Sequence, residues 1–265
     1  MYAFDLHRPK SLAEAAALLR DRDEAKLIAG GQTLIPTLRQ RLAAPQHLVD
    51  LGGVGGLAGI ELKGKALSIG AMARHAAVAE SALVHKAIPA LAELAALIGD
   101  PAVRVRGTLG GSLANNDPSA DYPAACLALN ATVFTNKRPI KADDFFTGLF
   151  ETALAADEII ERVKFPLADK AGFAKFRNPA SRFALTAVFV AKSGADVRVA
   201  VTGAGESGVF RAKEIEAALV KRFDAKAAEG VAVKATGLIS DVHGGADYRA
   251  HLIAVMAARA VAVAR

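Results

Sequence analysis

The sequence predicts a protein of mixed helices and strands with more than one domain, which begins with an α/β unit and has antiparallel strands near its end, and three observations support this. Strand-like and helical patterns alternate through the first fifty residues, from the extended "YAFDLH" and the helical "SLAEAAALLRD" to the strand "HLVDL". Glycines then cluster between positions 52 and 59 and indicate a boundary. Beyond Ala174, the segments "FAKFRN", "ALTAVFVAKSG" and "DVRVAVTGAG" are typical of antiparallel strands, with Ser193 and Gly194 as a turn.

The first predicted domain covers residues 1–56. Its first helix is expected to start near Ser11, because Ser11 and Glu14 have the spacing of a capping box. The short apolar run "AKLIAG" predicts a buried strand, and the following "TLIPTLRQRLA" predicts a short helix.

The second predicted domain covers residues 57–167 and the third covers residues 168–265. In the second, "ALSIGAMA" predicts a strand, and the next helical stretch is expected to form two helices that Pro89 separates. A glycine-rich loop is predicted from Gly107 to Asp121, followed by the helix "YPAACLALNA" and the strands "TVFTN" and "IIERVKFP". The third domain contains the antiparallel strands and closes with the helix "DYRAHLIAVMAARAVAVA".

Length and composition exclude several classes of protein. The chain has 265 residues, of which 52% are hydrophobic, so a sizeable core can form. No apolar run is long enough to cross a bilayer, and the N-terminus lacks the pattern of a secretory signal. The formal net charge is +6, but no zinc finger, RNA-recognition signature or basic arm is present. We therefore expect a cytoplasmic protein that does not bind nucleic acid and whose charge suits an anionic ligand or an acidic partner.

A single cysteine restricts the metal chemistry of the chain. Cys126 cannot form an internal disulfide, and one thiolate cannot hold a zinc ion or an iron–sulfur cluster. It lies in an apolar helical pattern, which predicts a buried structural thiol. The six histidines are scattered, and no Ser–His–Asp set is apparent, so we predict neither a metal site nor a catalytic residue.

One dinucleotide-binding motif is present in an unsuitable context. The segment "VTGAGESG" gives Gly203, Gly205 and Gly208 the spacing G-x-G-x-x-G after an apolar strand. A Rossmann site requires a parallel βαβ unit whose second strand ends in an acidic residue. Here the preceding strands resemble a meander, and no clear strand precedes Asp224, so a Rossmann site is not predicted. A looser match at residues 53–58 is followed by a strand and is interpreted as a loop.

A different glycine signal, "AGGQTLIP", follows the predicted strand near residue 28. Gly30 and Gly31 remove side chains where the backbone would approach a ligand, and their N–H groups can converge on an anion. A helix starting near Thr33 or Leu34 would add the positive end of its dipole. Thr33 adds a hydroxyl group.

The loop "GTLGGSLANND" is expected to repeat this arrangement. Gly110 and Gly111 form a second glycine pair, Thr108 and Ser112 add hydroxyl groups, and Asp121 could accept a hydrogen bond from a ribose hydroxyl. Two such loops in one chain predict a diphosphate bridged between them. The alternative is a pair of tight turns without a ligand.

These segments give the chain a resemblance to a known family. The sequence resembles the FAD-binding medium subunit of the molybdenum hydroxylases, which include xanthine dehydrogenase and aerobic carbon monoxide dehydrogenase. The resemblance covers nearly the whole chain and includes "YAFDLHRPKSLAEAAALL", "AGGQTLIPTLRQRLAAPQHLVDL", "IGAMARHAAVAES", "VRVRGTLGGSLANNDPSADYPAA", "FFTGLFETALAADEIIERVKFP" and "YRAHLIAVMAARAV". The chain differs from the family where Asn115 and Asn116 replace a common His-Ala pair, and it is short around "FTNKRPIKADDFF".

The resemblance implies a fold and a set of cofactor contacts. The fold would be a FAD-binding domain of the PCMH, or vanillyl-alcohol-oxidase, type with two α+β subdomains, followed by a C-terminal α/β domain of the carbon monoxide dehydrogenase flavoprotein type. The implied FAD contacts are Leu27, Ile28, Ala29, Gly30, Gly31, Gln32, Thr33 and Leu34 in the first loop, Thr108, Gly110, Gly111 and Ser112 in the second, Asp121 near the adenosine, and Ile160 and Arg177 on the flavin side. Phe183 would lie in the segment that passes near the isoalloxazine ring.

The resemblance also implies an oxidoreductase subunit that transfers electrons and has no catalytic residue of its own. A large partner subunit would hold the molybdenum cofactor, and a small one would hold two [2Fe-2S] clusters. Electrons would pass from those clusters through FAD to an external acceptor, in an assembly expected to be a dimer of heterotrimers. The alternatives are a self-sufficient FAD-dependent oxidase of the same fold and a non-enzymatic nucleotide-binding module.

Overall fold

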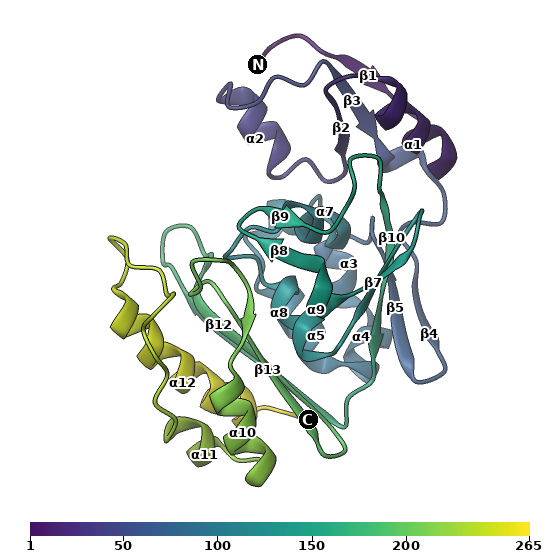
Figure 1. The fold of residues 1–265 in the computed structure, drawn as a ribbon. Helices are drawn as coiled ribbons and strands as arrows, with labels where there is room; N and C mark the ends of the chain where they lie inside the picture. The colour runs from purple at the N-terminus through teal and green to yellow at the C-terminus, as the bar shows by residue number, and fades with distance from the viewer.

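The computed structural model describes residues 1–265 and contains three larger sheets, each formed by one stretch of the chain (Figure 1). The N-terminal sheet lies at the top of the view, the five-stranded sheet lies below it, and the C-terminal sheet lies at the lower left beside its own helices. No helix of the structure is both long and apolar enough to pass through a membrane.

The N-terminal sheet is parallel, with the strand order β1-β3-β2. Its elements are β1 (Asp5–His7), α1 (Leu12–Asp21), β2 (Ala25–Ile28), α2 (Leu34–Arg39) and β3 (His47–Asp50). The predicted start of α1 is confirmed, because the Ser11 hydroxyl accepts the N–H of Glu14 at 3.2 Å. The Glu14 carboxylate accepts from the N–H of Lys10 rather than from that of Ser11, so only half of the capping box forms.

The second sheet is antiparallel, with the order β4-β5-β10-β6-β7. A short 3-10 helix, η1 (Leu51–Gly53), leads into it, and its strands are β4 (Ile60–Lys63), β5 (Ala66–Gly70), β6 (Thr132–Thr135), β7 (Pro139–Lys141) and β10 (Ile160–Pro166). The helices of this stretch are α3 (His75–Glu80), α4 (Ala82–Ala87), α5 (Pro89–Ala96), α6 (Pro101–Arg104), α7 (Leu109–Asn115), α8 (Tyr122–Ala128) and α9 (Ala142–Phe145). A small hairpin consists of β8 (Phe146–Gly148) and β9 (Glu151–Thr152).

Two local predictions for this stretch were wrong. The helical stretch before residue 99 forms three helices rather than two, because the Ser81 hydroxyl caps Val84 and starts α4 before Pro89 starts α5. The predicted loop from Gly107 to Asp121 contains the helix α7.

The C-terminal sheet is antiparallel, with the order β11-β12-β13-β14, as the meander pattern predicted. Its elements are β11 (Lys170–Arg177), β12 (Ala184–Ser193), β13 (Asp196–Thr202), β14 (Phe210–Arg211), α10 (Lys213–Lys221), α11 (Ala225–Glu229) and α12 (Ala246–Ala262). Because β13 pairs antiparallel with both of its neighbours, the G-x-G-x-x-G segment after it does not open a Rossmann unit. Helix α12 approaches β11 closely at Gly172, where a Cβ would lie 1.9 Å from the carbonyl oxygen of Ala260.

The largest hydrophobic core joins the second and third stretches. It includes buried residues of β5 and β10, such as Leu67 and Val163, together with Phe173 of β11 and Phe189 of β12. The chain therefore passes from the second sheet to the C-terminal sheet near residue 168, but one hydrophobic core includes residues on both sides of that position. The assignment of 1–56, 57–167 and 168–265 as domains stays a prediction.

Candidate functional site

The first glycine loop connects the end of β2 to the start of α2. Leu27 and Ile28 end the strand, Ala29 to Thr33 form the loop, and Leu34 begins the helix. Gly31 has a φ of +73°, a left-handed conformation that a side chain would strain. The sequence therefore requires glycine here for the chain to turn from strand to helix.

The backbone N–H groups of this loop are available to a ligand. None of the N–H groups from Ala29 to Leu34 donates a hydrogen bond within the chain, and the loop is half-buried to exposed. The Thr33 hydroxyl does not cap the helix that it precedes. The Gln32 side chain donates back to the Gly30 carbonyl at 3.4 Å. These donors are free to pair with a ligand, and the anion site that the sequence predicts here stays a prediction.

The second loop does not repeat this arrangement, which corrects the prediction. The N–H of Gly110 donates to the carbonyl of Ala71 at 2.8 Å, the N–H of Gly111 to the Thr108 hydroxyl at 3.2 Å, and the N–H of Ser112 to the Thr108 carbonyl at 3.0 Å. Gly110 is needed for packing, since a Cβ there would lie 2.6 Å from the Cβ of Ala71. The N–H groups of this glycine pair therefore form the first turn of α7 and its contact with Ala71. The contacts of Thr108, Gly110, Gly111 and Ser112 with FAD stay predictions.

The two loops meet directly. A Cβ on Gly30 would lie 2.2 Å from the carbonyl oxygen of Arg106 and 2.7 Å from the Cα of Gly107. A Cβ on Gly111 would lie 3.8 Å from the Cβ of Ala29. Figure 1 shows the connection between β2 and α2 lying over α7. The fold therefore brings both glycine signals to one junction between the N-terminal sheet and the second sheet.

Asp121 lies behind this junction in a buried ion pair. Its Oδ2 is 2.6 Å from the Nζ of Lys175, and the two side chains are 4% and 1% exposed. Lys175 comes from β11 and also donates to the carbonyl of Leu97. Burial raises the pKa of Asp121 to about 6, although the Lys175 ammonium acts in the opposite direction. The other oxygen, Oδ1, is enclosed by protein and has no hydrogen-bond partner.

The role of Asp121 toward the cofactor thus stays a prediction, and the structure gives the carboxylate a different partner. Sequence reasoning did not find Lys175, because nothing local marks a lysine on a strand as the partner of an aspartate at the start of a distant helix. The pair joins the C-terminal sheet to α8.

His75 supports the second loop from inside. Its backbone N–H donates to the carbonyl of Gly107 at 2.9 Å, and its ring lies where a Gly107 side chain would be, 2.6 Å from the Cβ position. Burial, together with the nearby charge of Arg104, lowers the pKa of His75 to about 4, so the ring is neutral at pH 7. Its Nδ1 has no partner, nor does the hydroxyl of Tyr122, whose ring centroid is 5.4 Å away. His75 therefore has a packing role beneath the second loop.

The remaining predicted contacts are on β10, on β11 and in the turn that follows β11. Ile160 starts β10, and its side chain is buried in the large core. Arg177 ends β11, is exposed and makes no ion pair. Phe183 is exposed and lies in a turn closed by the N–H of Asn178 donating to its carbonyl. Contacts of Ile160 and Arg177 with FAD stay predictions.

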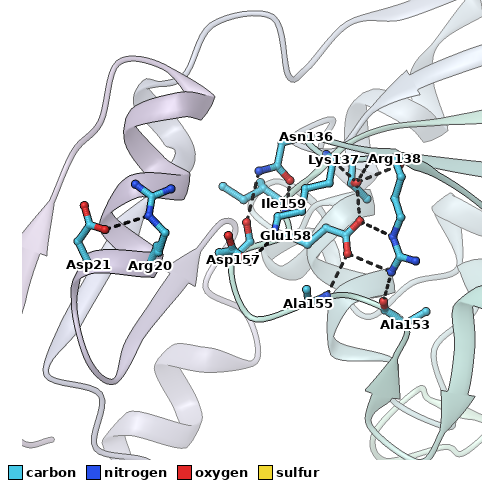
Figure 2. A network of polar contacts seen from close by, with 11 residues as sticks. Arg20, Asp21, Asn136, Lys137, Arg138, Ala153, Ala155, Asp157, Glu158 and Ile159 are labelled. Carbon is cyan, nitrogen blue, oxygen red and sulfur yellow. Dashed lines mark hydrogen bonds and ion pairs between the residues drawn. The ribbon is translucent and has the colours of Figure 1, made fainter.

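A polar network fixes the segment that leads into β10 (Figure 2). The Glu158 carboxylate, 1% exposed, accepts from the Arg138 guanidinium, the Thr135 hydroxyl and the N–H of Ala155. Burial alone would raise the pKa of Glu158, but these hydrogen bonds outweigh it and hold the pKa at about 2. Beside it, Lys137 pairs with Asp157. The network is structural and connects the turn between β6 and β7 to β10.

Neither the single cysteine nor the surface recesses described below belong to the glycine loops. Cys126 is fully buried, as predicted, and burial raises the pKa of its thiol well above the usual range, so it is not a nucleophile. Two recesses of the surface are lined by residues outside the glycine loops. One is on the outer face of the five-stranded sheet around Arg162 and Lys164, and the other lies around Phe183 and Arg249. The candidate site is therefore the open polar junction of the two loops, and binding of a ligand there stays a prediction.

Comparison with known proteins identifies related chains of nearly the same length. A family model described as "FAD binding domain in molybdopterin dehydrogenase" matches residues 2–168. The nicotine 6-hydroxylase medium subunit of Paenarthrobacter nicotinovorans is 38% identical over 267 residues, which cover 96% of this chain and 94% of that protein. The carbon monoxide dehydrogenase medium chain of Hydrogenophaga pseudoflava is 35% identical, with 97% of this chain and 96% of that protein covered.

A solved structure shows the same fold. The quinoline 2-oxidoreductase structure from Pseudomonas putida 86 matches with a TM-score of 0.89 and 34% identity, covering 98% of this chain and 96% of that chain. The match includes the C-terminal sheet as well as the two sheets that meet at the glycine loops.

Proposed function

Because the chain belongs to the family of FAD binding domains in molybdopterin dehydrogenases, we propose that it is the FAD-carrying electron-transfer subunit of a heteromeric molybdenum hydroxylase. In this proposal FAD receives electrons from the [2Fe-2S] clusters of a small partner subunit and delivers them to an external acceptor. A large partner subunit holds the molybdenum cofactor and selects the substrate. The chain is thus an oxidoreductase subunit that binds FAD.

One observation carries the proposal at the level of residues, namely the unpaired N–H groups from Ala29 to Leu34 beside the Gly30–Gly107 contact. These groups would hold the diphosphate of FAD, since phosphate oxygens are acceptors and the missing side chains leave room for close approach. The hydroxyls of Thr33, Thr108 and Ser112 would add further donors. The residues therefore fit the cofactor that the family implies.

The proposed partners rest on the names and lengths of the relatives. Relatives are named a medium subunit, a medium chain and a subunit of a 6-hydroxypseudooxynicotine dehydrogenase complex, and this chain covers 94–96% of each of them. A single cysteine leaves this chain unable to hold an iron–sulfur cluster itself. We propose a cytoplasmic dimer of heterotrimers, in which the clusters and the molybdenum cofactor belong to the other subunits.

The first experiment is purification from the native host, with an absorbance spectrum and a denaturing gel of the same fraction. A flavin band, iron–sulfur absorption and two further polypeptides are expected. A flavin band on a lone polypeptide that oxidises a substrate would favour the self-sufficient oxidase. No flavin, even after incubation with FAD, would reject the proposal.

A second experiment tests the first loop. Gly31→Val places a side chain at the site on a residue with a left-handed backbone. The control, Gly56→Val, places the same side chain on another left-handed residue, at φ +81°, where no atom lies within 4 Å of the new Cβ. The two variants carry similar backbone strain. We expect the Gly31 variant to lose FAD while it stays folded and the Gly56 variant to retain FAD. Equal flavin content in both would contradict the assignment of the loop.

A further inference from the structure

Neither glycine loop carries a charged side chain, although the diphosphate of FAD is doubly anionic. Residues 29–34 and 108–112 contain only apolar, amide and hydroxyl side chains. Neutral N–H groups can orient phosphate oxygens, but phosphate sites in proteins commonly include a guanidinium, whose fork of donors matches two oxygens. The junction is flanked by two exposed arginines that the sequence analysis did not include in the site, Arg106 and Arg74, and only Arg74 is paired across a bridge with Thr108.

Arg74 lies directly opposite Thr108 in an isolated antiparallel bridge. The bridge is bracketed by two hydrogen bonds, from the N–H of His75 to the Gly107 carbonyl and from the N–H of Leu109 to the Ala73 carbonyl. The pair is therefore of the close, non-hydrogen-bonded type. Side chains of such a pair leave the same face of the bridge, with Cβ atoms about 4.5–5.5 Å apart.

That face is the one on which the two loops meet. A Cβ on Gly111 would lie 2.9 Å from the Thr108 hydroxyl oxygen and 3.8 Å from the Cβ of Ala29. The Thr108 side chain therefore lies close to the first loop. Arg74 shares this face. In Figure 1, helix α3, which follows Arg74, lies beside α7 and below the connection between β2 and α2.

The guanidinium of Arg74 is not used by the fold. Arg74 is exposed, whereas Ala73 and His75 on either side of it are buried, so its side chain points away from the core. It takes part in none of the ion pairs of the chain, although the exposed arginines Arg8 and Arg20 do. It precedes α3 without making a side-chain capping bond.

We propose that Arg74 binds the phosphate oxygens of FAD and supplies the positive charge that the two loops lack. This inference rests on the proposed function, because it assigns a residue to the same cofactor. Arg74 is then a binding residue for the diphosphate, and it contributes nothing to recognition of the adenosine. The interaction is partly exposed to solvent, so added salt weakens it.

The test measures binding of FAD to the full chain, with ADP and adenosine as competitors. The variants are Arg74→Ala and Arg74→Lys, and the matched control is Arg259→Ala, an exposed arginine on α12 without an ion pair. We expect the Kd for FAD and for ADP to rise about tenfold in Arg74→Ala, as for the loss of one charged hydrogen bond. Adenosine binding stays unchanged, the salt dependence of FAD binding becomes shallower, and Arg74→Lys recovers part of the affinity.

Wild-type affinity and salt dependence in Arg74→Ala, with FAD still bound, would overturn this inference and leave the proposed function intact. Equal losses for ADP and adenosine would also overturn it, because they would indicate a damaged site rather than a lost phosphate contact. A wild-type chain that binds no FAD would reject the proposed function, and this inference would fail with it.

Discussion

Gly30 and Gly107 lie with their backbones in contact, so that a Cβ on Gly30 would be 2.7 Å from the Cα of Gly107. The N-terminal parallel sheet and the antiparallel sheet below it approach each other at this point, and each contributes a glycine. The contact brings the unpaired N–H groups of the first loop next to Thr108. The absence of a side chain on Gly30 therefore allows the two loops to meet, whereas the absence of one on Gly107 leaves room for the ring of His75.

Gly30→Ala should separate the loops. The added methyl group would lie 2.2 Å from the Arg106 carbonyl oxygen, which belongs to the backbone and cannot rotate away. We expect the free energy of unfolding to fall by about 1–3 kcal/mol, as for other overpacked sites, and FAD affinity to fall with it. Urea unfolding measures the first effect. Gly55→Ala is the control, since no atom lies within 4 Å of that Cβ position, and an equal effect of both variants would contradict the prediction.

Lys175→Met should be strongly destabilising, because it leaves the Asp121 carboxylate buried without a cation. The expected cost is about 3–5 kcal/mol in urea unfolding. The double variant Lys175→Met with Asp121→Leu should recover most of that loss, because it removes both charges. The control is Lys63→Met, which breaks an exposed ion pair with Glu61. If Lys175→Met lowers the free energy of unfolding no more than this control does, the buried pair contributes little to stability.

His75 should make the protein less stable as the pH falls from about 6.5 to about 4. Its pKa is about 4 in the folded chain and about 6.5 when unfolded, so the unfolded state binds the proton more tightly within this range. The expected loss is on the order of 3 kcal/mol. Asp121 acts in the opposite direction between about pH 4 and pH 6, because its pKa is raised in the folded state. The difference in stability between wild type and His75→Gln as a function of pH isolates the histidine, and a difference independent of pH would contradict its assignment as a neutral buried ring.

Arg138→Met should make the protein more sensitive to acid. Above about pH 4.5 the ionised Glu158 stabilises the fold, and this contribution is lost as the pH falls toward its folded pKa of about 2. Without the guanidinium that folded pKa rises, so Glu158 stabilises the fold less above pH 4.5, and the less stable chain should unfold at a higher pH. Acid unfolding followed by circular dichroism measures the midpoint. An unchanged midpoint would indicate that Thr135 and the N–H of Ala155 suffice to hold the carboxylate.

Most of the strands could be predicted from the sequence, because their signals are local. The apolar runs of β12 and β13, with Gly194 between them at φ +59°, specify a hairpin without reference to the rest of the chain. Helix α7 was missed because two glycines in its first turns suggest a loop. The capping hydroxyl of Thr108 and the packing of Gly110 on Ala71 favour the helix, and the second of these is a tertiary contact.

The site was predicted in part. The glycine pairs identified both loops, but the sequence could not show that only the first keeps its N–H groups free, since the acceptor for Gly110 lies on another segment. The Asp121–Lys175 pair joins the start of α8 to a strand of the C-terminal sheet, and the sequence around neither residue indicates the other. Arg74 could not be assigned to the site from the sequence either. An arginine before a helix is common, and only the bridge to Thr108 places this one beside the second loop.

The difference between the two loops also decides how the affinity for a cofactor is set. The second loop is held by its own hydrogen bonds on either side of Thr108, so it keeps its shape whether or not a ligand is present. In the first loop the carbonyls of Gly30, Gly31 and Thr33 accept hydrogen bonds but no N–H group from Ala29 to Leu34 donates one, so a ligand that accepts from these groups would restrict the backbone further as it binds. Part of the binding energy is therefore spent on conformational entropy in a single short segment. Substitutions that stiffen this segment in its native conformation would tighten binding without adding any contact to the ligand.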